Sequence, residues 1–250
     1  MSKFIRPPDD IQIASMNVKK AAIRDPMMHG SGTPWEDRGS LGMVGAYFKT
    51  VGQSLLAPAK LLGSIRRPET FTDARAFALA SGIGWGVGLG IICFLDMRRK
   101  LADINNYDVE PNMYYLGIAL QLVLAPFVTL LMVNIVASIF SKMVSSEMKG
   151  RNAPLILMKN LFAYTTGPGA LAVVPIVGPA LAGVWIFVTM MVAGRSRLQL
   201  GFASTFTAVL FASIAVTGLS LAMYYVGWFA FAAMTGAYVY VKPTESFLGI

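Results

Sequence analysis

The amino-acid sequence predicts an all-α fold: a polytopic membrane protein with about five transmembrane helices and an N-terminal amphipathic helix. More than half of the residues are apolar (55%) and only 14% are charged, whereas about 25% of the residues of a soluble domain are charged. An apolar helix of about 20 residues crosses the roughly 30 Å hydrocarbon core of a bilayer. Four tracts without any Asp, Glu, Lys, Arg or His reach that length: 76–95, 111–141, 160–194 and 198–241.

The chain before the first tract divides into two parts. Residues 1–40 are polar and rich in Gly, Pro, Ser and charge, which is typical of a flexible cytoplasmic tail. Residues 41–75 are predicted to form an amphipathic segment, interrupted near Pro58. Two compatible interpretations are open: this helix lies along the cytoplasmic leaflet, or it packs against the ends of the spans. Its regularly spaced apolar residues are Val44, Tyr47, Phe48, Val51, Leu55 and Leu62.

Residues 76–241 form the predicted membrane domain. The first two tracts each fit one helix, whereas the third and fourth are longer than a single span needs. Pro175 and Pro179 indicate a tight uncharged turn that divides the third tract into two helices. Residues 228–241 are short for a span and form an interfacial stretch, a continuation of the preceding helix, or a sixth helix. The predicted spans are 76–95, 113–140, 155–174, 176–193 and 202–225.

The basic residues are distributed unevenly about these spans. With the N-terminus in the cytoplasm, 17 of the 21 Lys and Arg residues lie on the cytoplasmic side. Cytoplasmic loops of membrane proteins carry an excess of Lys and Arg, so this distribution favours an odd number of spans with the N-terminus inside. The net charge of +8 is therefore interpreted as cytoplasmic flanks that contact anionic lipids, and nucleic acid is not expected as a partner.

The first predicted span carries a row of glycines. Gly82, Gly86 and Gly90 recur every four residues, so they lie on one face of a helix and allow another helix backbone to approach closely. This face is expected either to pack against a helix of the same chain, which we favour, or to form a dimer contact.

Two polar residues lie in the second predicted span, Gln121 and Asn134. They are interpreted as hydrogen-bonding groups between helices, and the alternative is a substrate path through the membrane. Asp, Glu, Lys, Arg and His are absent from the depth of every predicted span, which argues against ion-coupled transport.

The sequence contains few of the residues that catalytic sites commonly use. Its one histidine, His29, lies in the polar tail, and its one cysteine, Cys93, lies in an apolar tract. A zinc-protease motif, a serine–histidine pair and a cysteine metal site each need residues that this chain does not place together. We therefore predict a protein that is not an enzyme and that holds no cofactor or metal.

Short motifs in three places resemble the bacterial Yip-domain proteins, a family of membrane proteins related to Rab-interacting proteins. Residues 32–38 read GTPWEDR, residues 164–168 read YTTGP, and residues 174–178 read VPIVG before a tryptophan in the next helix. The resemblance covers about residues 30–215. Its motif residues are Pro34, Trp35, Glu36, Tyr164, Pro168, Pro175, Gly178 and Trp185.

The resemblance implies a five-pass domain with a cytosolic N-terminus, located in the bacterial cytoplasmic (inner) membrane. Eukaryotic relatives bind Rab-type GTPases and act in vesicle formation and membrane shaping, but their Asp-Leu-Tyr-Gly-Pro signature is absent here. We therefore expect a non-enzymatic protein that organises or shapes the membrane or serves as a scaffold. Its expected partners are the lipid bilayer and either other membrane proteins or a second copy. The alternative is a small permease, a channel, or an accessory subunit of a larger membrane complex.

Overall fold

The computed structural model describes residues 30–66, 70–102, 111–147, 155–174 and 177–235. Strands are absent from these residues, which confirms the all-α prediction for the described chain. Most of the predicted tail, Pro175 and residues 236–241 lie outside the described residues. The helices are α2 (Arg38–Leu41), α3 (Met43–Leu56), α4 (Pro58–Ser64), α5 (Thr72–Ala102), α6 (Pro111–Glu147), α7 (Leu155–Tyr164), the 3₁₀ helix η1 (Gly167–Val173), α8 (Val177–Val192), the π-helical turn η2 (Ala193–Arg197) and α9 (Phe202–Thr235).

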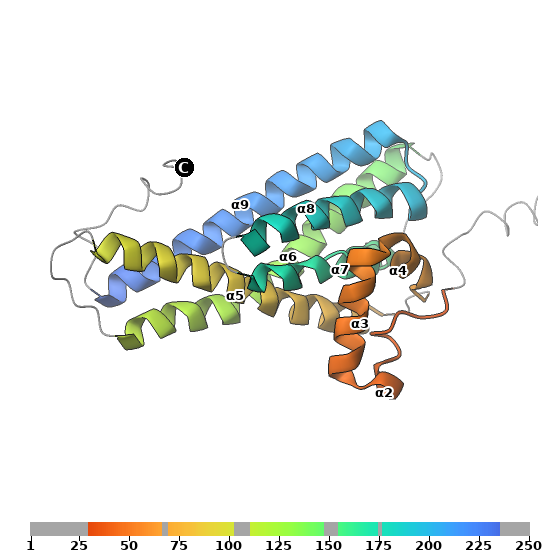
Figure 1. The fold of residues 1–250 in the computed structure, drawn as a ribbon. Helices are drawn as coiled ribbons and strands as arrows, with labels where there is room; N and C mark the ends of the chain where they lie inside the picture. The colour runs from red at the N-terminus through yellow and green to blue at the C-terminus, as the bar shows by residue number, and fades with distance from the viewer. Residues whose placement is uncertain (1–29, 67–69, 103–110, 148–154, 175–176, 236–250) are drawn as a thin grey trace, which may run out of the picture.

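Three long helices form the body of the molecule, and α6 packs against both α5 and α9 (Figure 1). They contain 31, 37 and 34 residues, so each exceeds the roughly 20 residues that a span needs. Residues 228–235 belong to α9. This part of the last tract is therefore a continuation of the preceding helix.

Four helical stretches of the described chain are long and apolar enough to cross a membrane. They coincide with four of the five predicted spans. Their length and apolar composition are compatible with an integral membrane protein. These stretches are Thr72–Ile92, Ala119–Ser146, Val177–Arg197 and Phe202–Val226.

The remaining predicted span, 155–174, is not one continuous helix. The α-helix ends at Tyr164, and the chain continues as the 3₁₀ helix η1. Pro168 has no backbone N–H to continue the α-helical pattern, and the Gly169 N–H instead bonds the Thr166 carbonyl at 2.8 Å, a 3₁₀ spacing. The prediction of a regular third helix is therefore wrong, because the Gly-Pro-Gly sequence interrupts it within the bundle.

The segment α7–η1 and helix α8 run in opposite directions beside each other (Figure 1). η1 packs against α5 and against the start of α8. η2, at the far end of α8, contacts α4. Both outer ends of this hairpin therefore lie at the end of the bundle where α5 begins.

Helix α3 crosses that end of the bundle at a steep angle to the long helices (Figure 1). Its buried residues are mostly small: Ala46, Thr50, Val51 and Ser54. The larger apolar residues Val44 and Phe48 are exposed instead. The predicted apolar stripe is thus divided: Val51 is buried and Tyr47 and Leu55 are half-buried against the core, whereas Val44 and Phe48 lie on the outside.

Candidate functional site

The residues of the GTPWEDR motif form a compact turn before α2. The Thr33 N–H donates to Glu36 Oε2 at 2.8 Å, and the Glu36 N–H donates to Thr33 Oγ1 at 3.2 Å. This reciprocal pair has the pattern of a helix capping box. Pro34 is buried between the two residues. The turn is therefore held by its own side chains and presents Trp35 and Glu36 to the bundle.

Trp35 anchors this turn to the beginning of α5. Its side chain is 3% exposed, and its ring packs edge-on against Tyr47 at 6.3 Å and Phe77 at 5.7 Å. The indole N–H donates to the Asp73 carbonyl at 2.8 Å. Arg38 covers the outer side, with its guanidinium 5.3 Å from the Trp35 ring centroid and 2.7 Å from Asp73 Oδ1.

Glu36 connects the same turn to two further segments. Its Oε1 accepts a hydrogen bond from the Tyr164 hydroxyl at 3.3 Å, and its Oε2 accepts from the Arg66 backbone N–H at 3.4 Å. Arg66 also forms an ion pair with Asp37 at 2.6 Å. Desolvation by burial raises the pKa of the Glu36 carboxyl, and the hydrogen bonds from the Thr33 and Arg66 backbones and from Tyr164 oppose that rise.

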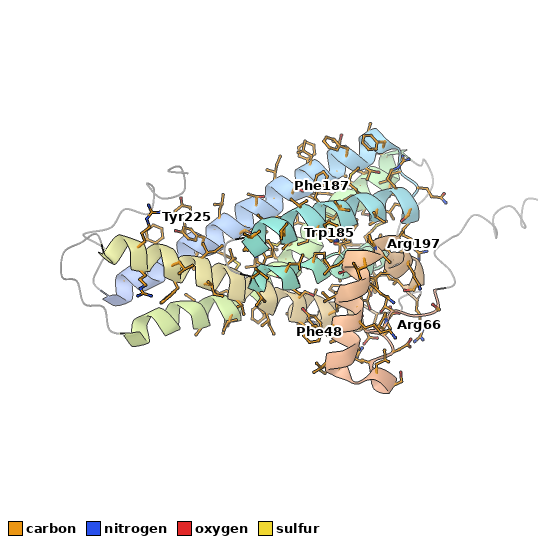
Figure 2. The ribbon with its side chains drawn as sticks, in the orientation of Figure 1. Phe48, Arg66, Trp185, Phe187, Arg197 and Tyr225 are labelled. Atoms are coloured by element: carbon orange, nitrogen blue, oxygen red, sulfur yellow. The ribbon has the colours of Figure 1, made fainter. Side chains whose placement is uncertain are left out.

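These contacts join parts of the chain that are far apart in sequence. Tyr164 lies 128 residues from Glu36, and Asp73 lies 38 residues from Trp35. Figure 2 shows Arg66 among the N-terminal segments at this end of the molecule. We define the N-terminal clasp as Trp35, Glu36, Arg38, Arg66, Asp73 and Tyr164.

The other motif residues hold α3 and the α7–η1–α8 hairpin together. The Trp185 indole N–H donates to the Leu55 carbonyl at the end of α3, at 3.0 Å (Figure 2). Pro168 is buried at the start of η1. Gly178 is buried at the start of α8, where a Cβ would collide with the Leu171 carbonyl. The structure thus connects Glu36 directly to Tyr164 and links Trp35 to Tyr164 through the ring of Phe77. It places Pro168, Gly178 and Trp185 in the adjoining hairpin.

The sequence analysis assigned no role to Arg38, Arg66 or Asp73. Arg38 is the last residue of the GTPWEDR motif, and Arg66 was included only in the overall count of cytoplasmic basic residues. Asp73 had a local signal, because it is the acidic residue in the first turn of α5, where an acid interacts favourably with the helix dipole. Its ion pair with Arg38 has no local signal, since it depends on how the N-terminal turn docks.

The glycine face of α5 packs within the chain. A Cβ on Gly82 would lie 2.6 Å from Pro126 Cα, and a Cβ on Gly86 would lie 2.8 Å from the Gln121 carbonyl oxygen, both on α6. Gly90 is buried as well. These contacts agree with the interpretation that the glycine row packs within the chain, because α6 already covers Gly82 and Gly86.

The two polar residues of α6 have different surroundings. Gln121 is completely buried, and its Nε2 donates to the Met223 carbonyl of α9 at 2.9 Å. Asn134 donates to the Leu130 carbonyl of its own helix at 2.8 Å. The interhelical interpretation therefore describes Gln121, whereas the hydrogen bond of Asn134 lies within its own helix.

Both carboxylates of the clasp are used in contacts within the chain. Asp73 pairs with Arg38, and Glu36 accepts hydrogen bonds from Tyr164 and from the Arg66 backbone. Across the described residues, no three His, Cys, Asp or Glu side chains gather closely enough to hold a metal ion. Comparisons with protein-family models, with curated proteins and with solved structures found no match for this chain.

The buried Glu36 carboxyl makes the clasp sensitive to pH. Because burial raises its pKa above the ordinary value of 4.5, the docked state binds a proton more readily than the unfolded chain does. This contribution to stability is therefore largest below pH 4.5 and declines as the pH rises through the raised pKa. The expected result is a fall in the unfolding temperature of the detergent-solubilised protein as the pH rises from 4.5 through the raised pKa of Glu36.

The matched control is Glu36→Gln, which keeps an acceptor for Tyr164 but does not titrate. The difference in unfolding temperature between wild type and this variant should change in that pH interval, because other titrating groups are common to both proteins. A constant difference across the interval would contradict the assignment of pH sensitivity to Glu36.

Proposed function

We propose that this chain is a non-enzymatic, five-pass integral membrane protein that shapes or organises the bilayer through α3. The observation that carries the proposal is an exposed apolar surface on this helix. The rest of the described chain leaves this surface uncovered. Val44 is 70% exposed, Phe48 is 65% exposed and Leu56 is 89% exposed. An apolar helix surface of this kind enters the boundary between lipid headgroups and acyl chains.

The setting of α3 supports a position in the membrane interface. It crosses the bundle steeply (Figure 1), so it lies close to the membrane plane if the long helices span the bilayer. Lys49 and Lys60 are exposed on α3 and α4, where they are placed to attract anionic headgroups. A helix inserted in one leaflet expands that leaflet and favours curvature.

The topology of the proposal has its own support. The fifth pass is the α7–η1 segment, which pairs with α8 as a hairpin whose outer ends lie beside α4. The N-terminus and the outer ends of the hairpin would then face the cytoplasm, in keeping with the excess of basic residues at that end. Membership of the Yip-domain family is part of the same proposal, and the hydrogen bond between the motif residues Glu36 and Tyr164 supports it.

The proposal is tested by reconstitution into vesicles that contain phosphatidylglycerol and phosphatidylcholine. Wild-type protein should tubulate the vesicles or reduce their diameter in electron micrographs. A variant that replaces the exposed apolar residues of α3 with glutamine should lose most of this effect, because less apolar surface enters the leaflet. This variant carries Val44→Gln, Phe48→Gln and Leu56→Gln.

A matched control makes three valine-to-glutamine changes at the turn between η1 and α8. Val173→Gln, Val174→Gln and Val177→Gln alter exposed apolar residues without touching α3, so vesicle shape should stay as in wild type. Unchanged vesicle morphology in the α3 variant, or equal loss in both variants, would count against the proposal.

The interrupted α7–η1 segment favours a second candidate, a small permease for uncharged solutes. Irregular backbone at membrane depth occurs where it is buried in protein or lines a cavity, and Thr165, Thr166 and Gly169 line such a cavity. Solute flux into liposomes that hold the purified protein would favour this candidate, and vesicle deformation without flux would favour the first.

A further inference from the structure

A cavity lies in the middle of the bundle, beside the interruption between α7 and η1. Its walls come from α5, α6, α8 and α9 as well as from the interrupted segment. About 40 Å³ of it can hold the centre of a water molecule, several times the roughly 10–15 Å³ that one water needs. The total empty space, including the open side, is about 490 Å³. The enclosed part therefore has room for the polar end of a molecule whose remainder lies on the open side.

Two side chains of α5 bring unused hydrogen-bonding groups to this cavity. Ser81 Oγ and Trp85 Nε1 are buried atoms without a hydrogen-bond partner, and both residues line the cavity. Tyr47 is a polar neighbour of Ser81, so the indole N–H of Trp85 is the group that most needs a partner. A buried polar group without a partner costs about 1–3 kcal/mol, so both groups favour a ligand that supplies a partner.

The threonines of the cavity wall are different, because their hydroxyls are already used. Thr129 donates to the Ala125 carbonyl and Thr165 donates to the Phe162 carbonyl, at 2.8 Å and 2.7 Å. The polar atoms of the cavity wall that lack a hydrogen-bond partner therefore belong to Ser81 and Trp85. These two residues lie one helical turn apart on α5, so a single acceptor atom or two adjacent ones can face both.

The position of the cavity defines the kind of molecule that can reach it. Ser81 and Trp85 lie about 14 Å and about 20 Å along the candidate span that begins at Thr72, from the 1.5 Å rise per residue of an α-helix. Both therefore lie near the middle of this candidate span. The cavity is partly open, and Trp85, Ile186 and Val216 in its wall are partly exposed. A ligand would enter from the lipid.

The absence of ionisable groups from the cavity wall limits the kind of ligand further. The lining residues carry no ionisable group, and an unpaired charge at this depth is costly. The indole N–H is a donor only, and a serine hydroxyl can donate as well as accept. From these observations we infer that the cavity binds an uncharged, membrane-dissolved molecule with an apolar body and a carbonyl-type acceptor, which receives hydrogen bonds from Trp85 Nε1 and Ser81 Oγ. This inference depends neither on bilayer shaping by α3 nor on solute flux.

The test uses two fluorinated probes that differ in one group. The probe 4′-fluoroacetophenone has a carbonyl acceptor, and 1-ethyl-4-fluorobenzene has nearly the same shape without it. Both are titrated into lipid nanodiscs that contain the full-length protein, with empty nanodiscs as the baseline for partitioning, and binding is followed by fluorine NMR. The ketone should bind saturably and about fivefold to tenfold more tightly than the ethyl probe, as one or two net hydrogen bonds imply.

Variants assign the effect to the two donors. Trp85→Phe removes the indole N–H while keeping an aromatic ring, and Ser81→Ala removes the hydroxyl; each should reduce the preference for the ketone, and the double variant should abolish it. Ser220→Ala is the matched control, because the Ser220 hydroxyl bonds the Val216 carbonyl and does not line the cavity. Thermal unfolding confirms that each variant is folded, and Ser81→Ala alone still tests the inference if Trp85→Phe fails to fold.

Three results would overturn the inference. The first is equal binding of both probes to the wild-type protein. The second is an unchanged ketone preference in folded Ser81→Ala and Trp85→Phe proteins. The third is the absence of saturable ketone binding above the empty nanodiscs, which would leave the cavity to water alone.

Discussion

Replacing Trp35 with alanine is expected to detach the N-terminal turn from the bundle and to destabilise the protein by about 3–5 kcal/mol, the usual cost of deleting a buried large aromatic side chain. The side chain is 3% exposed and packs against Tyr47 and Phe77. Its loss also removes the hydrogen bond to the Asp73 carbonyl and the ring that lies under Arg38. The measurement is the unfolding temperature in detergent, together with protease cleavage within residues 30–66.

Phe48→Ala provides the matched control for Trp35→Ala. Phe48 is an aromatic residue of the same N-terminal region, but its side chain is 65% exposed. Its truncation in detergent should change stability by less than about 1 kcal/mol, as for other exposed positions. If both variants lost the same stability, or if the N-terminal segment stayed resistant to protease in Trp35→Ala, the anchoring role of Trp35 would be disproved.

Replacing Gly86 with leucine is expected to separate α5 from α6. A Cβ at this position would lie 2.8 Å from both Ala125 Cβ and the Gln121 carbonyl oxygen, so even alanine requires a shift of the neighbouring backbone. Overpacking of a core costs about 1–3 kcal/mol and occasionally more, and leucine adds three further carbon atoms at a contact made by backbone. The expected result is a large fall in unfolding temperature in detergent and loss of a monodisperse elution peak.

Gly218→Leu is the matched control, because Gly218 lies in α9 and a Cβ there would meet no atom within 4 Å. This variant should retain the wild-type unfolding temperature. Should Gly86→Leu also retain wild-type assembly and stability, close packing of α5 on α6 would not be needed for the fold. A changed oligomeric state with unchanged stability would instead favour the dimer interpretation of the glycine row.

The long helices were predictable because their signal is local. Each tract in α5, α6 and α9 is apolar over more than about 20 consecutive residues, and that property depends only on composition along the chain. The α7–η1 segment is also largely apolar, with Lys159 near its start, so hydropathy predicted one more regular helix. The Gly-Pro-Gly sequence at 167–169 disfavours a regular α-helix. Its effect on the backbone, however, depends on the 3₁₀ hydrogen bonds that replace the α-helical pattern.

The candidate site was predictable only in part. The motif resemblance singled out Trp35, Glu36 and Tyr164, but it did not predict that the last two bond each other. It included Arg38 without a role and left out Arg66 and Asp73, because charged residues beside a membrane domain usually face solvent or headgroups. Their roles depend on the docking of the 30–38 turn against α5 and α7.

The sequence by itself determined that this protein is helical, which tracts can enter a membrane, and that the depth of those tracts carries no charge. These properties follow from the transfer of each residue between water and lipid, which adds up along the chain. Only the tertiary structure decided that α3 exposes its large apolar residues, that the clasp joins Glu36 to Tyr164, and that Ser81 and Trp85 share a cavity with the interrupted helix. Contacts between distant segments depend on shape and hydrogen-bond geometry in three dimensions, which no local pattern specifies.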